Sequence, residues 1–415
     1  MGSRYYRHLF ECQGDVIIQS GSVLDDETKQ RTSYVYLAGY NNQRLSKKSV
    51  QIMDRLENGA VLDLCILGVW TCSAIIGLLH ILKTHPTYTV ILPYMTPLQR
   101  LHLAGGVPTD FGDRRELIYF LDYPYESLRK TGVENIYFLC GNGEPLQEDP
   151  DYLTDGYHFT LEDKELSKLI NGMEGQRIPV LRSGYIKENN WLFYFGTFGT
   201  RVLQTRQFMK EYSKASSGRR HTEYQRLQEM LSCFEKRFGE FPYPSIVMYQ
   251  SPVCDRPSET ASLMTGKSYP TGRGCSAAIP VCGENCALRC QHANDYEYMQ
   301  KHRDKKRNCA RMGIWHMGNA DLKEYFPQIA AYFRPFINKT RALMLSDGGR
   351  RDYWNPQLIK ELSGEENIYW ITSAEKCVAP ETLLEIMSAQ GYNRLININE
   401  NYGFCFSGYL ISEQL

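Results

Sequence analysis

Short, almost wholly apolar runs recur along the chain, separated by stretches of mixed polarity. An apolar run bounded by turn residues is typical of a strand that is buried on both faces of a sheet. The pattern therefore predicts a series of buried strands, over residues 9–18 (a strand pair), 33–39, 62–68, 87–94, 133–140, 191–196, 244–249 and 310–317.

Helical periodicity fills much of the chain between these strands, with apolar residues three and four positions apart. The Ser-Ser-Gly-Arg-Arg segment at 216–220 predicts a break in the longest helix, and Asp321 is a residue type favoured at a helix start. The alternation of strands and helices predicts the α/β class. The predicted helices cover 49–56, 161–171, 203–238 and 322–333, and a further helix opens at Ile75.

Residues 61–82, VLDLCILGVWTCSAIIGLLHIL, are long and apolar enough to be compared with a membrane span. Asp63 and His80 interrupt the ends of this stretch, and Thr71 and Ser73 interrupt its middle. A buried strand, a turn and a helix explain the run without a membrane. We therefore predict a strand–turn–helix unit and no membrane association.

The same stretch carries the first of several family resemblances. It resembles the start of a metallo-β-lactamase-fold hydrolase, where a strand runs into H-x-H-x-D-H and then into a helix opening "I-x-G-L". Here the helix opens at Ile75 to Leu78, and the four ligand positions hold Val69, Thr71, Ser73 and Ala74. Zinc binds imidazole, thiolate or carboxylate, so none of these four residues is an ordinary zinc ligand.

Further segments resemble that family, in its competence-protein-like branch, and occur in the family's order. Residues 9–18 resemble its first strand pair, and Ala38 stands where the 33–39 strand would carry an acid. Residues 316–322 resemble "Y-T-G-D-A-N-L", 343–350 resemble "V-L-x-x-P-H-H-G-S", and 372–380 resemble "S-A-G … H-P". The expected metal ligands of these later motifs are replaced by Asn319, Asp347, Gly348 and Ala379.

The resemblance implies one domain over residues 1–415, a metallo-β-lactamase-like αββα sandwich of two mixed sheets with outer helices. A Cys/Gly/Pro-rich insertion interrupts it at 252–309. The former active-site edge would lie where 69–74, 319, 347–348 and 379 converge. Because every expected ligand is replaced, the resemblance implies no metal cofactor at that edge.

Charge and composition narrow the function classes. The 415 residues carry 47 basic and 47 acidic side chains, which argues against a generally basic nucleic-acid-binding surface. An apolar content of 42% suits a folded globule. The start MGSRYYRHLF has no apolar signal-peptide core, so the 13 cysteines are expected to be reduced in the cytoplasm.

The insertion concentrates residues that bind zinc. Its core is C-x3-C-x3-C-x-H, formed by Cys282, Cys286, Cys290 and His292, with Cys275 and Cys309 at the ends of the 275–309 segment. Thiolates and an imidazole in a short polar loop are what one tetrahedral structural zinc needs, and a long loop gains most from such a metal. The alternative is a set of free thiols, on a surface loop or buried as small apolar residues.

Residual chemistry is conceivable near the degenerate motifs. Asp347, His316 and Asp321 would form a rebuilt acid/base site if they converged. Alternatively, Asp347 belongs to a turn with Gly348, His316 packs at a strand end, and Asp321 begins a helix. Cys72 in the turn is either a nucleophile of low pKa at a helix N-terminus or a buried cysteine without a catalytic role, and we favour the second interpretation.

Basic residues supply two binding hypotheses. Arg350, Arg351 and Lys376 follow the degenerate loops and could hold an anion such as a phosphate or nucleotide, or could be solvated charges. The basic segment 301–311, together with 216–221, could contact a nucleic-acid backbone, although an interrupted run is usually a solvated face.

These observations favour a catalytically inactive metallo-β-lactamase-like protein that acts as a structural, regulatory or ligand-sensing subunit with protein partners. The family resemblance suggests a bacterial anti-phage defence system as the setting. The alternatives are a hydrolase with a rebuilt active site and a nucleic-acid-binding module that uses 301–311.

Overall fold

The computed structural model describes most of the chain. It leaves out residues 1–2, 14–15, 26–28, 40–60, 108, 110, 142–152, 162–163, 217–222, 239–242, 254–257, 260–261, 268–312, 350–352, 363–367, 374–384, 387–394, 399–401 and 412–415.

The described strands form one large mixed sheet that consists of two runs. The first run is, in spatial order, β17 (Tyr402–Ile411), β1 (Ser3–Gln13), β2 (Val16–Asp25), β3 (Arg31–Gly39), β4 (Leu62–Leu67), β5 (Thr87–Pro93) and β6 (Asn135–Leu139). The second is β8 (Val180–Glu188), β9 (Trp191–Phe198), β10 (Ser245–Pro252), β13 (Gly313–His316), β14 (Thr340–Met344), β15 (Tyr369–Ser373) and β16 (Leu395–Ile398).

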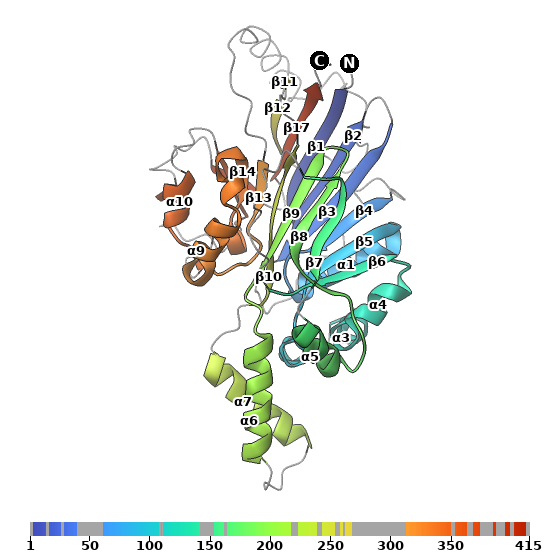
Figure 1. The fold of residues 1–415 in the computed structure, drawn as a ribbon, viewed down its shortest axis with the longest axis vertical. Helices are drawn as coiled ribbons and strands as arrows, with labels where there is room; N and C mark the ends of the chain where they lie inside the picture. Colours follow the sequence, from blue (N-terminus) through green and yellow to red (C-terminus); the bar gives the residue numbers. More distant parts are fainter. Residues whose placement is uncertain are drawn as a thin grey trace.

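Pairing between β6 and β8 joins the two runs, with Phe138 opposite Val180 and Leu139 opposite Leu181. The sheet curls, so that strands of the first run face strands of the second (Figure 1). The Tyr36 hydroxyl on β3 donates to the carbonyl of Ile246 on β10 at 2.9 Å. Three more strands lie at the margins, with β7 (Gly156–Leu161) on β8, and with β11 (Ser258–Glu259) and β12 (Ser262–Lys267) on β17.

Apolar side chains form three main layers around this sheet. Along β3, Tyr34, Tyr36 and Ala38 enter an inner layer between the runs, while Val35 and Leu37 face the helices. This alternation follows from the two-residue period of a strand. Many large apolar side chains fill the inner layer, so their burial is a main contribution to holding the curled sheet together.

Helices cover the outer faces of both runs. The first run carries α1 (Cys72–Thr84), α2 (Pro97–Gly105), α3 (Arg114–Asp122), α4 (Pro124–Lys130) and α5 (Lys164–Glu174). The second carries α9 (Leu322–Tyr332), the 3-10 helices η3 (Arg334–Lys339) and η4 (Ser346–Gly349), and α10 (Gln357–Leu362).

Helices α6 (Val202–Ser216) and α7 (Glu223–Phe238) extend away from the sheet as a helical arm (Figure 1). A small apolar cluster ties the arm to α2, formed by Leu98 with Phe208 and Phe234. The break predicted at 216–220 lies, apart from Ser216, outside the described residues, and the described helices are α6 up to Ser216 and α7 from Glu223.

The α/β class predicted from the sequence is confirmed. The described strands form one curled mixed sheet, because β6 pairs with β8 and connects the halves.

The helix predicted to open at Ile75 begins three residues earlier, because the Thr71 side chain accepts the N–H of Ala74 and caps α1. Leu161 ends β7, and the helix predicted over 161–171 spans Lys164–Glu174. The helix predicted over 49–56 lies outside the described residues.

The apolar stretch 61–82 forms β4, a turn and most of α1, as predicted. Within the described part of the chain, no helix combines the length and the apolar character that crossing a membrane requires.

Candidate functional site

Ends of several strands meet at one edge of the curled sheet. The Ser245 hydroxyl donates to the Gly68 carbonyl at 3.2 Å and accepts the backbone N–H of Asn319 at 2.7 Å. The Asn319 amide nitrogen donates in turn to the Gly39 carbonyl at 2.7 Å. We call Gly39, Gly68, Ser245, Gly318 and Asn319 the strand-end cluster. It connects β3, β4, β10 and the segment after β13.

Two glycines let the backbones of this cluster approach one another closely. A Cβ on Gly68 would overlap the Tyr36 hydroxyl, and a Cβ on Gly318 would lie 2.5 Å from the Ser245 hydroxyl. Gly318 also has a φ of +56°, in the left-handed region. The cluster is therefore packed backbone to backbone, with side chains of Tyr36 and Ser245 between the strands.

The turn after β4 holds the first four positions at which the sequence resemblance expects metal ligands. Val69 is fully buried in the inner apolar layer and forms an isolated bridge with Ser245. Thr71 caps α1, and Ser73 and Ala74 are buried in its first turn. All four side chains thus have structural roles in packing or capping.

The later degenerate motifs come to the same edge. The N–H of Asp347 donates to the Gly318 carbonyl at 2.9 Å, and the Ser346 hydroxyl donates to the Ala320 carbonyl at 2.6 Å. Asp347 is fully buried, has a φ of +43°, and lies in η4 together with Gly348. The structure therefore brings residues 69, 319 and 347 to one place, although they are up to 278 residues apart in sequence (347 minus 69).

Several predicted site residues lie outside the described residues. Among the residues that the structure does describe, no group of three or more His, Cys, Asp or Glu side chains is placed to hold a metal ion. The predicted residues that lie outside are Ala379, the anion candidates Arg350, Arg351 and Lys376, the zinc candidates Cys282, Cys286, Cys290 and His292, with Cys275 and Cys309, and the basic segment 301–311.

His316 and Asp321, predicted as members of a rebuilt acid/base site, have separate structural roles. His316 lies in the inner layer, with its ring 4.8 Å from the Tyr36 ring and 5.9 Å from the Phe10 ring. Asp321 caps α9 by accepting the N–H groups of Lys323 and Glu324. These are the packing and capping roles that the sequence offered as the alternative.

A buried polar network that the sequence reasoning missed crosses the inner layer. Trp191 Nε1 can only donate, so it fixes the Gln250 oxygen toward itself at 3.2 Å. The Gln250 amide nitrogen then donates to His316 Nε2 and to the Gln19 oxygen, both at 3.0 Å. His316 must therefore accept at Nε2, which places the proton of its neutral ring on Nδ1.

The same network continues to a second histidine. The Gln19 amide nitrogen donates to the Tyr34 hydroxyl, and that hydroxyl shares a hydrogen bond of 2.5 Å with His8 Nδ1. Burial lowers the pKa of His8 to about 3, and burial with the neighbouring His8 lowers the pKa of His316 to about 3. The sequence signal that could have revealed this network is the presence of Gln19, Gln250 and His316 within otherwise apolar strands.

Cys72 stands at the first position of α1, where a helix N-terminus could activate a thiol. Burial instead raises the pKa of the Cys72 thiol to about 12. The thiol is therefore neutral at physiological pH, which supports the interpretation without a catalytic role.

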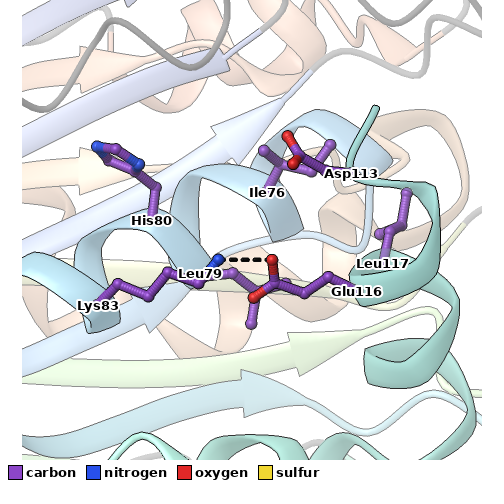
Figure 2. Close-up of a pocket in the computed structure, with 7 residues that line it drawn as sticks. All are labelled: Ile76, Leu79, His80, Lys83, Asp113, Glu116 and Leu117. Carbon is purple, nitrogen blue, oxygen red and sulfur yellow. Dashed lines mark hydrogen bonds and ion pairs between the residues drawn. The ribbon is translucent and has the colours of Figure 1, made fainter. Parts of the chain in front are cut away.

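A small pocket of about 70 Å³ lies between α1 and α3 (Figure 2). Lys83 and Glu116 in its wall already form an ion pair at 2.5 Å, and His80 and Asp113 are drawn on separate parts of the rim. The pocket is far below the roughly 300–1,000 Å³ of ordinary ligand sites, so it is a poor candidate for an organic ligand.

No model of a known protein family matches this chain, and no curated protein matches its sequence. Its function is therefore inferred from the residues and geometry of the chain itself.

Proposed function

We propose that the chain is a catalytically inactive metallo-β-lactamase-like protein that serves as a structural, regulatory or ligand-sensing subunit of a larger complex. The observation that carries this proposal is the strand-end cluster. Positions 69, 319 and 347, where the family resemblance expects metal ligands, come together. Apolar Val69 and the neutral amide Asn319 pack or bond within the fold there, and Asp347 is the one carboxyl among the three.

The chemistry of the cluster opposes metal binding. A catalytic zinc needs three protein ligands at about 2.0–2.3 Å and one open position. Here a single hydroxyl, that of Ser245, contacts both the Gly68 carbonyl and the Asn319 N–H, so the two motif segments are separated by one side chain. Val69 points into the apolar inner layer, which gives a metal ion no ligand.

The layering supports the finer fold assignment that we propose, the αββα sandwich. Helices cover the outer faces of both runs of strands, and the inner apolar layer lies between the runs. In this interpretation the two runs are separate sheets, and the short β6–β8 pairing connects them along one edge.

The subunit role follows from keeping a large fold whose metal site is lost. Its setting in a bacterial anti-phage defence system is an extension of the family resemblance alone. The rival hypothesis of a rebuilt hydrolase is weakened by the separate roles of His316 and Asp321. The nucleic-acid hypothesis depends on 301–311, outside the described residues.

Metal content per chain tests the inactive site and the structural zinc separately. Protein purified without chelator is compared by mass spectrometry with a Cys282→Ser/Cys286→Ser/Cys290→Ser variant. We expect either no metal in both samples or one zinc that the variant loses. Metal that survives in the variant, together with hydrolysis of a phosphodiester or β-lactam substrate, would overturn the proposal of an inactive protein.

The subunit role needs a second measurement. The tagged chain, expressed from its own locus, is expected to elute from a size-exclusion column with a partner protein at fixed stoichiometry. Elution of the chain by itself under conditions that preserve complexes would contradict a subunit role, while leaving the inactive-site proposal intact.

A further inference from the structure

A groove of about 770 Å³ lies between α5 and the segment that leads into β8. Its walls come from α5 and residues 177–181, and Tyr125 of α4 closes one side. The volume falls within the roughly 300–1,000 Å³ of sites for organic ligands. The groove includes no residue of the strand-end cluster.

The sequence of α5 explains which side chains line the groove. One stripe of the helix (Leu166, Leu169, Ile170 and Met173) packs on the apolar core of the first run. The other stripe places Lys164, Ser167, Lys168 and Asn171 along the groove, three and four positions apart.

The charges in the groove have one sign. Lys164, Lys168 and Arg177 are exposed cations, and no carboxylate is among the described residues that line the groove. Lys164 stands in the first turn of α5, next to Glu165, whose side chain is not among those that line the groove. Arg129 lies 6.0 Å from the centre of the Tyr125 ring, so a fourth cation is adjacent. An anionic ligand would offset this concentration of positive charge.

The floor of the groove is apolar and held in place. Ile178, Val180 and Leu181 are buried, and the Ile178 N–H donates to the Asn171 side-chain oxygen at 3.0 Å. Pairing of Val180 and Leu181 with β6 fixes the same segment from the other side. A preformed apolar floor beside a cationic wall suits a ligand that has both an apolar body and anionic groups.

We propose that this groove binds a phosphorylated organic ligand of nucleotide size. The phosphate groups would contact Lys164, Lys168 and Arg177, and the organic body would lie on the 178–181 floor beside Tyr125. A mononucleotide matches the volume, the charge and the apolar floor together. This ligand site goes beyond the proposed inactive role of the strand-end cluster and does not depend on it.

Isothermal titration calorimetry on the full chain tests the proposal with the four ribonucleoside triphosphates, the matching nucleosides and inorganic tripolyphosphate. We expect at least one triphosphate to bind more tightly than both its nucleoside and tripolyphosphate. The double variant Lys168→Gln/Arg177→Gln should weaken that binding about tenfold for each charge-assisted hydrogen bond lost. The titration is run with and without Mg²⁺, so that any dependence of binding on the metal ion is measured.

The matched control removes the same charge elsewhere. Lys210→Gln/Lys323→Gln changes two exposed lysines on α6 and α9 and should leave the affinity unchanged. Thermal melts of both double variants should match the parent chain, since all four side chains are exposed. The proposal is overturned if no triphosphate binds, if tripolyphosphate binds equally well, if both double variants lose affinity alike, or if only single-stranded oligonucleotides bind.

Discussion

Gly318 shows how one residue sets the geometry of the strand-end cluster. Its φ is positive, and a Cβ added to it would lie 2.5 Å from the Ser245 hydroxyl, which leaves no room for a side chain. We expect Gly318→Ala to destabilise the fold by about 2–5 kcal/mol, through backbone strain and overpacking. Chemical denaturation measures the change.

Gly172 provides the control for that substitution. It lies within α5, and a Cβ there would meet no atom within 4 Å. Gly172→Ala should stabilise the protein by about 0.5–1 kcal/mol, because alanine loses less conformational freedom in a helix. Equal effects at the two positions would show that the close approach at Gly318 has no energetic weight.

The two buried histidines make stability depend on pH. Their pKa values of about 3 in the folded protein lie below the ordinary value of 6.5, so between these limits the two histidines take up protons only in the unfolded chain. Their stabilising contribution is complete above pH 6.5 and is lost as the pH falls toward 3. Stability should therefore decrease from about pH 7 to about pH 5.

A His316→Gln variant isolates this effect. Gln can accept from Gln250 as His316 does, but it cannot ionise. We expect a lower stability at about pH 7 and a shallower loss of stability between about pH 7 and pH 5, measured by urea denaturation at each pH. A slope equal to that of the parent chain would contradict the assignment of a neutral, buried His316.

At the scale of the elements, the charge of Asp63 on β4 of the first run acts on Glu188 on β8 of the second. Burial and the neighbouring Asp63 raise the pKa of Glu188, and the Tyr157 hydroxyl opposes this shift. Burial also raises the pKa of Asp63, against the Ser33 N–H at 2.6 Å and the Arg31 charge. Both groups therefore hold protons more tightly in the folded protein.

The raised pKa values of Asp63 and Glu188 determine how their contribution to protein stability changes with pH. The favourable contribution of each carboxyl is present below its unfolded pKa and is lost as the pH rises through its folded pKa. Glu188→Gln should thus raise the melting temperature at neutral pH, and the gain should shrink as the pH falls toward the ordinary Glu value of 4.5. Glu134→Gln, at an exposed position before β6, serves as the control in the same melts. A gain that is independent of pH would contradict the raised pKa of Glu188.

Local elements could be predicted from the sequence because their signals are local. The apolar runs at 87–94 and 191–196 became β5 and β9, with small shifts at the ends. The predicted helix ends were less accurate where a capping side chain determines the first residue of the helix, as Thr71 does for α1. The pairing of β6 with β8 was not predictable, because β-pairing depends on cross-strand packing and register that periodicity does not encode.

At the scale of the whole molecule, the sequence resemblance predicted that the segments around residues 69, 319 and 347 lie together. The individual hydrogen bonds between distant segments could not be predicted from it. The hydrogen bond between Gln19 and Gln250 joins residues 231 positions apart. Each glutamine by itself is a polar residue in an apolar run, and only the curled sheet makes them partners. Likewise, Ser245 lies in the predicted 244–249 strand, which resembles a strand of the same family, but nothing in that pattern predicted that its hydroxyl would bond to Gly68 and Asn319.

The proposed absence of a metal site can be tested by adding the ligands that the family resemblance expects. Restoring the family residues with Val69→His, Thr71→His and Asn319→Asp supplies three ordinary zinc ligands. Val69 is buried in the inner apolar layer, Thr71 caps α1, and the Asn319 amide donates to the Gly39 carbonyl, so each change removes a structural contact. We expect the triple variant to lose several kcal/mol of stability, since each change alone costs about 1–3 kcal/mol.

The same variant should take up no stoichiometric zinc at the strand-end cluster. The Ser245 hydroxyl still lies between Gly68 and Asn319, and a buried imidazole at position 69 would face apolar side chains. Zinc titration followed by calorimetry and by cobalt absorption spectra measures this, in the Cys282→Ser/Cys286→Ser/Cys290→Ser background so that the insertion contributes no thiolates. One tightly bound zinc with the spectrum of nitrogen and oxygen ligands would mean that only side chains, and not the packing of strand ends, separate this protein from an active hydrolase.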